Sequence, residues 1–182
     1  MDSEPKRIGV LGVLKIPMAL GVLRLSTEGR PDKADAIRVI HHALDRGIRV
    51  LDTADTYCLD ETDLHYGERL TREALASWSG DAADVRVITK VGMARPRGRW
   101  VPRGRPESLR KAVDGCLLAL GGERLFLCLL HVKDYRNPFE DSLGALAELQ
   151  QAGKIKHLGL CNVGVPEIRQ AQRRFEVQAL QH

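Results

Sequence analysis

Short apolar runs and segments with helical periodicity alternate along almost the whole chain of 182 residues. The runs expected to form strands are 48–54, 85–92, 125–131, 155–162 and the start of 176–182. The segments expected to form helices are 34–46, 66–78, 106–120, 139–152 and 165–175. Strict alternation with short turns predicts parallel strands joined by right-handed crossovers, which is an α/β architecture.

The first 23 residues contain two further apolar runs, 8–14 and 16–23, separated by Lys15. They form either a hairpin or a first strand preceded by a short ribbon, and the pattern leaves both open. With one strand in this segment, we expect six strands with five helices between them. A chain of this length suits one domain with a sizeable core.

Charge and hydropathy exclude some classes of partner. The net charge of +4 comes from 28 basic and 24 acidic residues. This charge is too small, and its signs too mixed, to indicate a nucleic-acid-binding protein, but it suits binding of a phosphate-bearing small ligand. No span reaches the ~18 apolar residues that a membrane helix needs. The N-terminus also lacks the apolar core of a signal peptide.

The cysteines and histidines indicate neither disulfides nor a metal. None of the cysteines has CxxC spacing, so we expect reduced, buried thiols and a cytoplasmic setting; these are Cys58, Cys116, Cys128 and Cys161. His41 and His42 are neighbours in a predicted helix, where adjacent side chains point in different directions. No metal site is expected.

The densest basic stretch, 94–110, is rich in Pro and Gly and is expected to be a solvated loop. Trp100 in this stretch either packs against the rim of the sheet or contacts a substrate, and the sequence leaves both open. His65 and Tyr66 likewise either line a pocket or lie in a surface loop.

Polar residues end four successive predicted strands. Asp52 ends the first, and Tyr57 follows it in the segment RVLDTADTY. The next three strands end at Lys90, at His131 and at Cys161–Asn162. Matching ends of parallel strands meet at one face, where ligands bind in α/β proteins.

Capping is the competing interpretation of this segment. Thr53 and Asp55 are residue types that close turns by hydrogen-bonding to nearby backbone, and we expect that role for both. Polar residues at four strand ends nevertheless favour a functional site over capping alone.

Asp52, Lys90 and Tyr57 together supply the parts of a general acid. Tyrosine, with a pKa of ~10, transfers protons poorly at neutral pH unless a nearby ammonium stabilises its phenolate. A carboxylate would in turn keep the buried lysine charged. His131 would orient a carbonyl oxygen. Because no side chain delivers hydride, this chemistry requires a nicotinamide cofactor.

These motifs resemble those of the aldo-keto reductase family over nearly the whole chain. DTADTY is similar to the family's DxA-x-x-Y signature, which places Asp52 and Tyr57 on two members of its catalytic tetrad. VITK places Lys90 on the third member. LLHVKD resembles the LLH-x-P-D strand and places His131 on the fourth.

The resemblance implies a TIM-type (β/α)8 barrel that reduces an aldehyde or ketone with NADPH, with Tyr57 as general acid and its pKa lowered by Lys90 and Asp52. GKIKHLGLCNV resembles a segment in which the residues matching Cys161 and Asn162 hold the nicotinamide carboxamide. Gln178, in EVQ, matches a glutamine of the same cofactor site. The implied partner is a small-molecule carbonyl compound.

Five positions depart from the family pattern. Cys161 replaces serine, Gly67 replaces Asn or Ser, Val22 replaces threonine, Phe126 replaces aspartate and Lys133 replaces proline. A thiol is also a poorer hydrogen-bond donor than a hydroxyl. Together these departures support a hypothesis of relaxed constraint.

A complete (β/α)8 barrel typically needs ~250 residues. We therefore expect residues 1–182 to form a single, incomplete barrel domain with about six of its eight β/α units, lacking the last two. Such an arc has two unpaired edges. Either the chain is a fragment, or it self-associates or binds a partner chain through those edges, or it is a weakly stable remnant. The alternative function is a truncated, catalytically impaired binding or remnant protein that needs a partner or holds its cofactor poorly.

Overall fold

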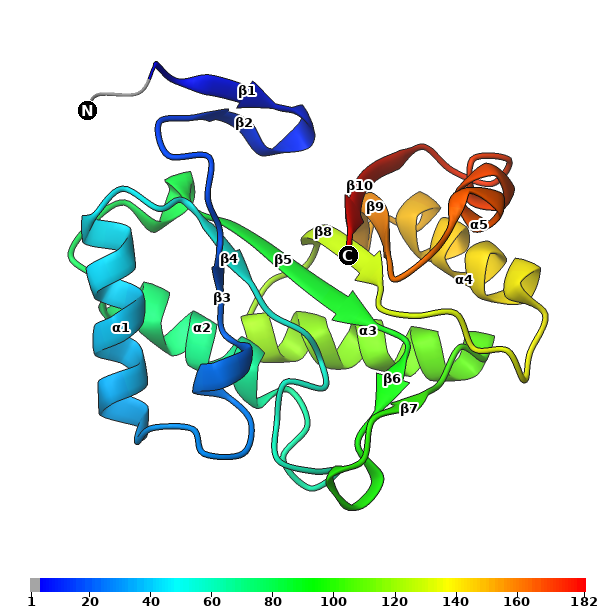
Figure 1. Cartoon of the computed structure of the whole chain (residues 1–182), viewed down its shortest axis with the longest axis horizontal. Coiled ribbons are helices and arrows are strands. Elements are labelled where there is room, and N and C mark those ends of the chain that lie inside the picture. The colour runs from blue at the N-terminus through cyan, green and yellow to red at the C-terminus, as the bar shows by residue number, and fades with distance from the viewer. Residues whose placement is uncertain (1–3) are drawn as a thin grey trace.

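A computed structural model describes residues 4–182. Six parallel strands form a curled sheet in the order β10-β9-β8-β5-β4-β3 (Figure 1). They are β3 (Leu20–Gly21), β4 (Val50–Asp52), β5 (Arg86–Val91), β8 (Leu125–Leu130), β9 (Ile155–Cys161) and β10 (Val177–Gln181). Each strand adds to the sheet in chain order, as in the wall of a barrel, so the predicted architecture is confirmed.

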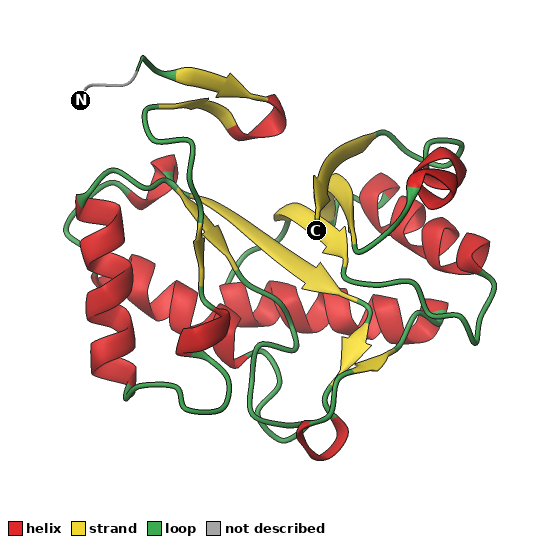
Figure 2. Ribbon diagram, in the orientation of Figure 1, coloured by secondary structure: helices red, strands yellow, loops and turns green. Residues whose placement is uncertain are grey.

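Five helices connect these strands and flank the sheet (Figure 2). They are α1 (Lys33–Asp45), α2 (Tyr66–Ser77), α3 (Pro106–Leu120), α4 (Phe139–Gln151) and α5 (Val165–Ala171). Local sequence sets their ends: the Asp32 carboxylate accepts a hydrogen bond from the Asp35 amide at 2.8 Å ahead of α1. Gly121 ends α3 at a φ of 73°, a conformation that glycine adopts at little cost.

Strand residues alternate between two apolar layers. Cys128 and Leu130 of β8 pack with the helices, whereas Leu127 and Leu129 face the other side of the sheet. Val10 and Leu11 cover that second side from the turn of an antiparallel hairpin, β1 (Lys6–Ile8) and β2 (Gly12–Leu14). The first apolar run is therefore a hairpin, and the second contributes the first strand.

Two further short strands, β6 (Met93–Ala94) and β7 (Val101–Pro102), form a hairpin that follows β5 directly. In the main sheet, β3 and β10 each pair with a single neighbour, so the two expected open edges are present. Self-association through those edges stays a prediction. No helix within residues 4–182 is long and apolar enough to span a membrane.

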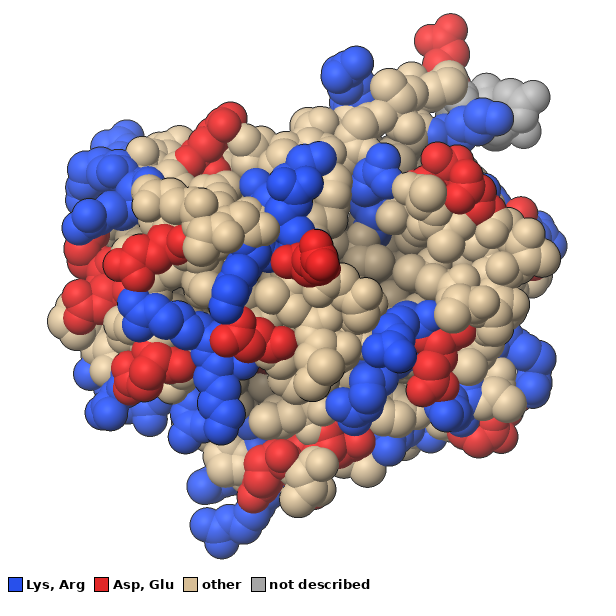
Figure 3. All heavy atoms as spheres, turned by 180° about the vertical axis from the view of Figure 1, so that it is seen from behind, with Lys and Arg blue, Asp and Glu red and all other residues tan. Residues whose placement is uncertain are grey.

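Basic and acidic side chains are interspersed on the face shown in Figure 3. This mixture matches the mild net charge of the composition. All four cysteines are free and buried, as expected from their spacing.

Candidate active site

The loop after β4 is held to the neighbouring strand by its backbone. The Thr53 amide donates to the Ile88 carbonyl at 2.8 Å, and the Asp55 amide donates to the Lys90 carbonyl at 3.1 Å. The Tyr57 carbonyl accepts from the Gly67 amide at 2.9 Å, which ties the loop to the start of α2. The loop that carries Tyr57 is thus fixed at both ends.

Lys90 is the centre of the site. Its Nζ lies 2.8 and 2.7 Å from the two carboxylate oxygens of Asp52 and 3.0 Å from the Thr53 carbonyl oxygen. It also donates to the Tyr57 hydroxyl oxygen at 2.9 Å. Lys90 is 1% exposed, so Asp52 supplies the counter-charge that a buried ammonium requires. Because the lysine donates to the phenol oxygen, the phenol proton stays available for another acceptor.

Burial raises the pKa of Tyr57 above its ordinary value of 10.0. The charge of Lys90 and its hydrogen bond oppose this rise, while the negative charge of Asp52 adds to it. The expected net lowering is therefore wrong for this structure, although Lys90 acts in the expected direction. At neutral pH the phenol keeps its proton, which is the state a general acid needs.

His131 lies beside Tyr57 at the end of β8. The ring centroids are 6.0 Å apart with an interplanar angle of 73°. Its Nδ1 is buried and has no hydrogen-bond partner among the described residues. Burial, helped by repulsion from Lys90, lowers the pKa of His131 from 6.5 to about 4. The imidazole is therefore neutral at pH 7 and able to donate one hydrogen bond.

This depressed pKa makes His131 a source of acid sensitivity. Between pH 6.5 and about 4 the unfolded chain binds a proton at this position and the folded chain does not, so His131 lowers stability as the pH falls through that window. In His131→Gln this contribution is absent. Urea unfolding should show the wild type losing about 2–3 kcal/mol relative to the variant between pH 7.5 and 4.5.

The exposed His42 provides a matched control for this experiment. His42→Gln should follow the wild-type profile of unfolding free energy against pH. Parallel profiles for His131→Gln and the wild type would contradict the burial of a neutral imidazole.

Cys161 and Asn162 lie at the end of β9, next to His131. Asn162 has a φ of 56°, and its Nδ2 donates to the His131 carbonyl at 3.0 Å. Gln181 pairs with Cys161 in the sheet, and its carbonyl accepts from the Asn162 amide at 3.0 Å. Amide and thiol groups therefore gather beside the tetrad, as hydrogen bonds to a carboxamide would require.

Gln178 precedes Gln181 in the same strand. It lies in β10 where the register shifts between Val177 and Ala179. There it lines a cavity of about 330 Å³ with Leu11 and Leu127, between the β1–β2 hairpin and the sheet, and Gln181 lines the same cavity. Gln181 pairs with Cys161, and the assignment of Gln178 to the cofactor site stays a prediction.

Thr53 and Asp55 are buried within the loop that follows β4. They are 0% and 4% exposed, and neither Thr53 Oγ1 nor Asp55 Oδ1 has a hydrogen-bond partner among residues 4–182. Burial, with repulsion from Glu68, raises the pKa of Asp55 well above its usual range. Hydrogen bonds with Thr56, one of them to its backbone, oppose this rise. The capping role of Thr53 and Asp55 stays a prediction.

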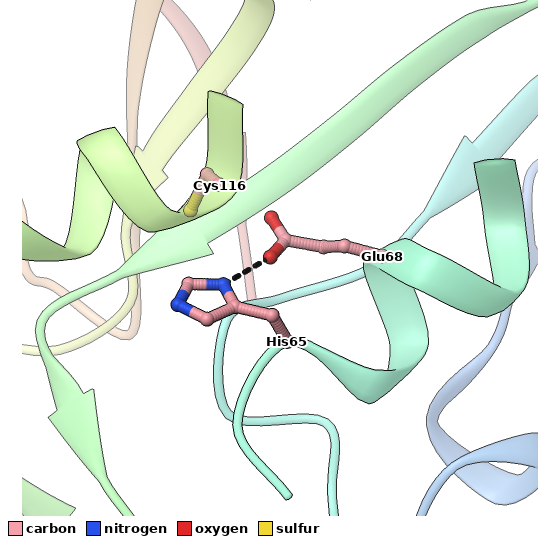
Figure 4. Close-up of side chains that lie close together, drawn as sticks. All are labelled: His65, Glu68 and Cys116. Atoms are coloured by element: carbon pink, nitrogen blue, oxygen red, sulfur yellow. Dashed lines mark hydrogen bonds and ion pairs between the residues drawn. The ribbon is translucent and has the colours of Figure 1, made fainter. Parts of the chain in front are cut away.

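His65, Glu68 and Cys116 place three potential ligand atoms within 4.8 Å of one another, in a chain whose sequence indicated no metal site (Figure 4). His65 Nδ1 lies 2.5 Å from Glu68 Oε2, and Thr89 Oγ1 donates to Glu68 Oε1 at 2.5 Å. Two ligands of a tetrahedral zinc ion would stand about 3.3 Å apart. A direct hydrogen bond between His65 and Glu68 fits these atoms better. Through its bond to Thr89, Glu68 also links α2 to β5.

His65 and Tyr66 both make structural contacts. His65 precedes α2 and bonds to Glu68, and the Arg30 guanidinium lies 3.6 Å from the centre of the Tyr66 ring. Gly67 follows them in a tight space. A Cβ there would lie 2.8 Å from Thr53 Oγ1 and 3.1 Å from Tyr57 Cβ, so packing against the Tyr57 loop explains this departure from the family pattern.

The basic loop is only partly solvated. Arg97 and Arg99 are exposed as expected, but Arg95 is 1% exposed, so the prediction is wrong for that residue. Trp100 lies with its ring centroid 6.4 Å from that of Tyr57 and 6.2 Å from that of His131. It therefore borders Tyr57 and His131, and contact of Trp100 with a substrate stays a prediction.

Residues 17–182 match the aldo/keto reductase family. The chain belongs to that family. It is 35% identical over 193 aligned residues to pyridoxine 4-dehydrogenase of Escherichia coli, an alignment that covers 100% of this chain and 64% of the relative. An uncharacterised oxidoreductase of Schizosaccharomyces pombe is 31% identical over 91% of this chain and 53% of its own length. The chain thus spans between half and two-thirds of these aldo/keto reductase relatives.

Solved aldo/keto reductase structures share the fold. The glycerol dehydrogenase of Gluconobacter oxydans superposes with a TM-score of 0.83 at 29% identity, covering 100% of this chain and 55% of that one. An aldo-keto reductase of Bacillus halodurans gives a TM-score of 0.77 at 24% identity, covering 98% of this chain and 57% of that one. The six-stranded arc is therefore part of an aldo/keto reductase barrel wall.

The remaining departures from the family pattern also have local contacts. Val22 is fully buried, and its amide donates to the Asp52 carbonyl at 2.9 Å. Lys133 forms an ion pair with Glu167 at 3.0 Å. The ring of Phe126 lies 5.3 Å from that of His157. Relaxed constraint stays a hypothesis for these aldo/keto reductase positions.

Proposed function

We propose that the protein is an oxidoreductase that reduces an aldehyde or ketone to an alcohol with NADPH. The observation that carries this proposal is the bond from Lys90 Nζ to the Tyr57 oxygen, with Asp52 behind the lysine. The names of the aligned relatives, a pyridoxine dehydrogenase and a glycerol dehydrogenase, support a reaction between an alcohol and a carbonyl compound.

In this proposal Tyr57 donates its phenol proton to the carbonyl oxygen. Lys90 stabilises the phenolate that remains, because its ammonium already touches the phenol oxygen at 2.9 Å. Asp52 keeps Lys90 charged and fixed in place. His131, neutral at pH 7, donates a hydrogen bond that orients the carbonyl. Bound NADPH would supply the hydride.

The residues at the end of β9 fit a nicotinamide carboxamide. We propose that Asn162 and Gln181 hold it through their side-chain amides and that Cys161 contributes a weaker contact. Gln181 replaces Gln178 in this role because only Gln181 pairs with Cys161. A cytoplasmic location is part of the proposal and rests on the four free, buried thiols.

Titration with NADPH, followed by protein fluorescence, tests the cofactor assignment. The wild type should show saturable binding, and Gln181→Ala should raise the dissociation constant about tenfold through loss of amide hydrogen bonds. Gln178→Ala is the matched control and should bind like the wild type. Absence of saturable binding would contradict the reductase proposal and favour the remnant-protein alternative, and a greater loss in Gln178→Ala would contradict the choice of Gln181.

A further inference from the structure

The β6–β7 hairpin contains a fully buried arginine next to an exposed tryptophan. The side chain of Arg95 has no exposed surface, and its guanidinium carbon lies 3.9 Å from the centre of the Trp100 ring. Trp100 is 42% exposed. Its ring meets those of Tyr57 and His131 edge to face, at interplanar angles of 80° and 73°.

Arg95 joins three loops that are distant in sequence. Its Nη2 donates to Glu28 Oε1 at 2.8 Å and to the Leu59 carbonyl at 2.9 Å. Glu28 lies before α1, Leu59 lies in the loop after Tyr57, and Arg95 itself belongs to the hairpin. The guanidinium therefore fixes the position of Trp100 relative to the Tyr57 loop.

This burial is poorly explained by stability alone. Arg95 Nε and Nη1 are buried without a hydrogen-bond partner among the described residues. A buried charge with unsatisfied donors is costly, and proteins tolerate such groups chiefly at functional sites. The same burial keeps Nε and Nη1 from touching a ligand, so Arg95 acts through Trp100.

We propose that Arg95 is a positioning residue that holds Trp100 as one flat wall of the substrate space, so that the site favours carbonyl groups attached to a planar aromatic ring. An indole held in one orientation stacks with a planar ring at little entropic cost, and a puckered ring of the same size loses that contact. The proposal rests on the proposed function and specifies the substrate class of that site.

A binding experiment tests the inference without catalysis. The chain has two tryptophans, so Trp78→Phe leaves Trp100 as the sole indole fluorophore. In this background, benzyl alcohol and cyclohexylmethanol form a pair matched in carbon number that differs in planarity. Benzyl alcohol should quench Trp100 and bind about tenfold more tightly. Arg95→Met should bring the ratio of dissociation constants close to unity.

Two further variants keep the result interpretable. Arg99→Met makes the same substitution at an exposed position of the same hairpin and should retain the tenfold preference. Arg95→Lys retains charge beside Glu28 but loses the planar stack on Trp100, so it should also lose the preference for benzyl alcohol. If circular dichroism shows that Arg95→Met does not fold, Arg95→Lys provides the test instead. Unchanged preference in Arg95→Lys, or equal binding of the two alcohols by the Trp78→Phe chain, would overturn the inference.

Reduction of benzaldehyde and cyclohexanecarbaldehyde with NADPH separates this inference from the proposed function. A preference for benzaldehyde in kcat/KM that disappears in Arg95→Met, while Tyr57-dependent reduction persists, supports both. Equal reduction of the two aldehydes overturns the inference and leaves the proposed function standing. Reduction of neither aldehyde, with the binding preference intact, contradicts the proposed function alone.

Discussion

Replacing Lys90 with methionine should lower the free energy of unfolding by about 3–5 kcal/mol, because Asp52 is then left buried without its counter-ion. The two side chains approach to 2.7 Å and are 2% and 12% exposed, so solvent screens the pair little. Asp52→Val should cost a similar amount, since it leaves the ammonium with only the Thr53 carbonyl and the Tyr57 hydroxyl. Urea unfolding of each variant measures both losses.

The double variant is the decisive comparison for this pair. Asp52→Val combined with Lys90→Met removes both charges and should recover most of the stability lost by either change alone. Reduction activity should not return, because the phenolate of Tyr57 has lost its ammonium. Additive losses in the double variant would contradict a coupled ion pair.

Tyr57→Phe should reduce kcat for aldehyde reduction about a thousandfold, the range typical of losing a positioned general acid. The ring still fills its place beside His131 and Trp100, so unfolding by urea should change little. NADPH should bind about as tightly as in the wild type, because the hydroxyl is the only group removed. A near-normal kcat for Tyr57→Phe would mean that a group other than Tyr57 donates the proton.

The pH dependence of the wild type adds a second readout for Tyr57. Burial raises the pKa of this phenol above 10.0, so kcat should stay level through the neutral range and decline only above that value. An inflection near neutral pH would mean that a different group supplies the proton.

The sequence predicted the architecture because each strand and helix has its own periodicity. Asp52, Lys90 and His131 end successive strands, and parallel pairing alone brings such ends to one face. The bond between Lys90 and Asp52 follows from that placement together with the length of the lysine side chain. The sequence therefore predicted that Asp52, Lys90 and His131 lie together at one face of the sheet.

The sequence is least informative where packing, rather than periodicity, decides. Gln178 and Gln181 both follow the strand pattern, and only the register shift after Val177 shows which one pairs with Cys161. The direction of the pKa shift of Tyr57 depends on how deeply its loop is buried. No sequence motif specifies that burial. Arg95 lies between residues that are partly or fully exposed, and its burial depends on Glu28 and Leu59.

Gly67 shows how a departure from a family pattern can mislead. As a residue type it indicates relaxed constraint, but a Cβ at this position would lie too close to Thr53 Oγ1 and tightly against Tyr57 Cβ, so any side chain would force the loop to shift. Sequence alone cannot distinguish a lost hydrogen-bonding residue from a close approach between a helix and a loop.

The most direct test of the account is isotope transfer to an aldehyde. Wild-type protein and Tyr57→Phe are incubated with benzaldehyde and with NADPH that carries deuterium at its transferable position, and the alcohol is analysed by mass spectrometry. We expect deuterated benzyl alcohol from the wild type and at most about a thousandth of that rate from the variant. Equal deuterium transfer by the two proteins, or none from wild-type protein saturated with cofactor, would contradict it.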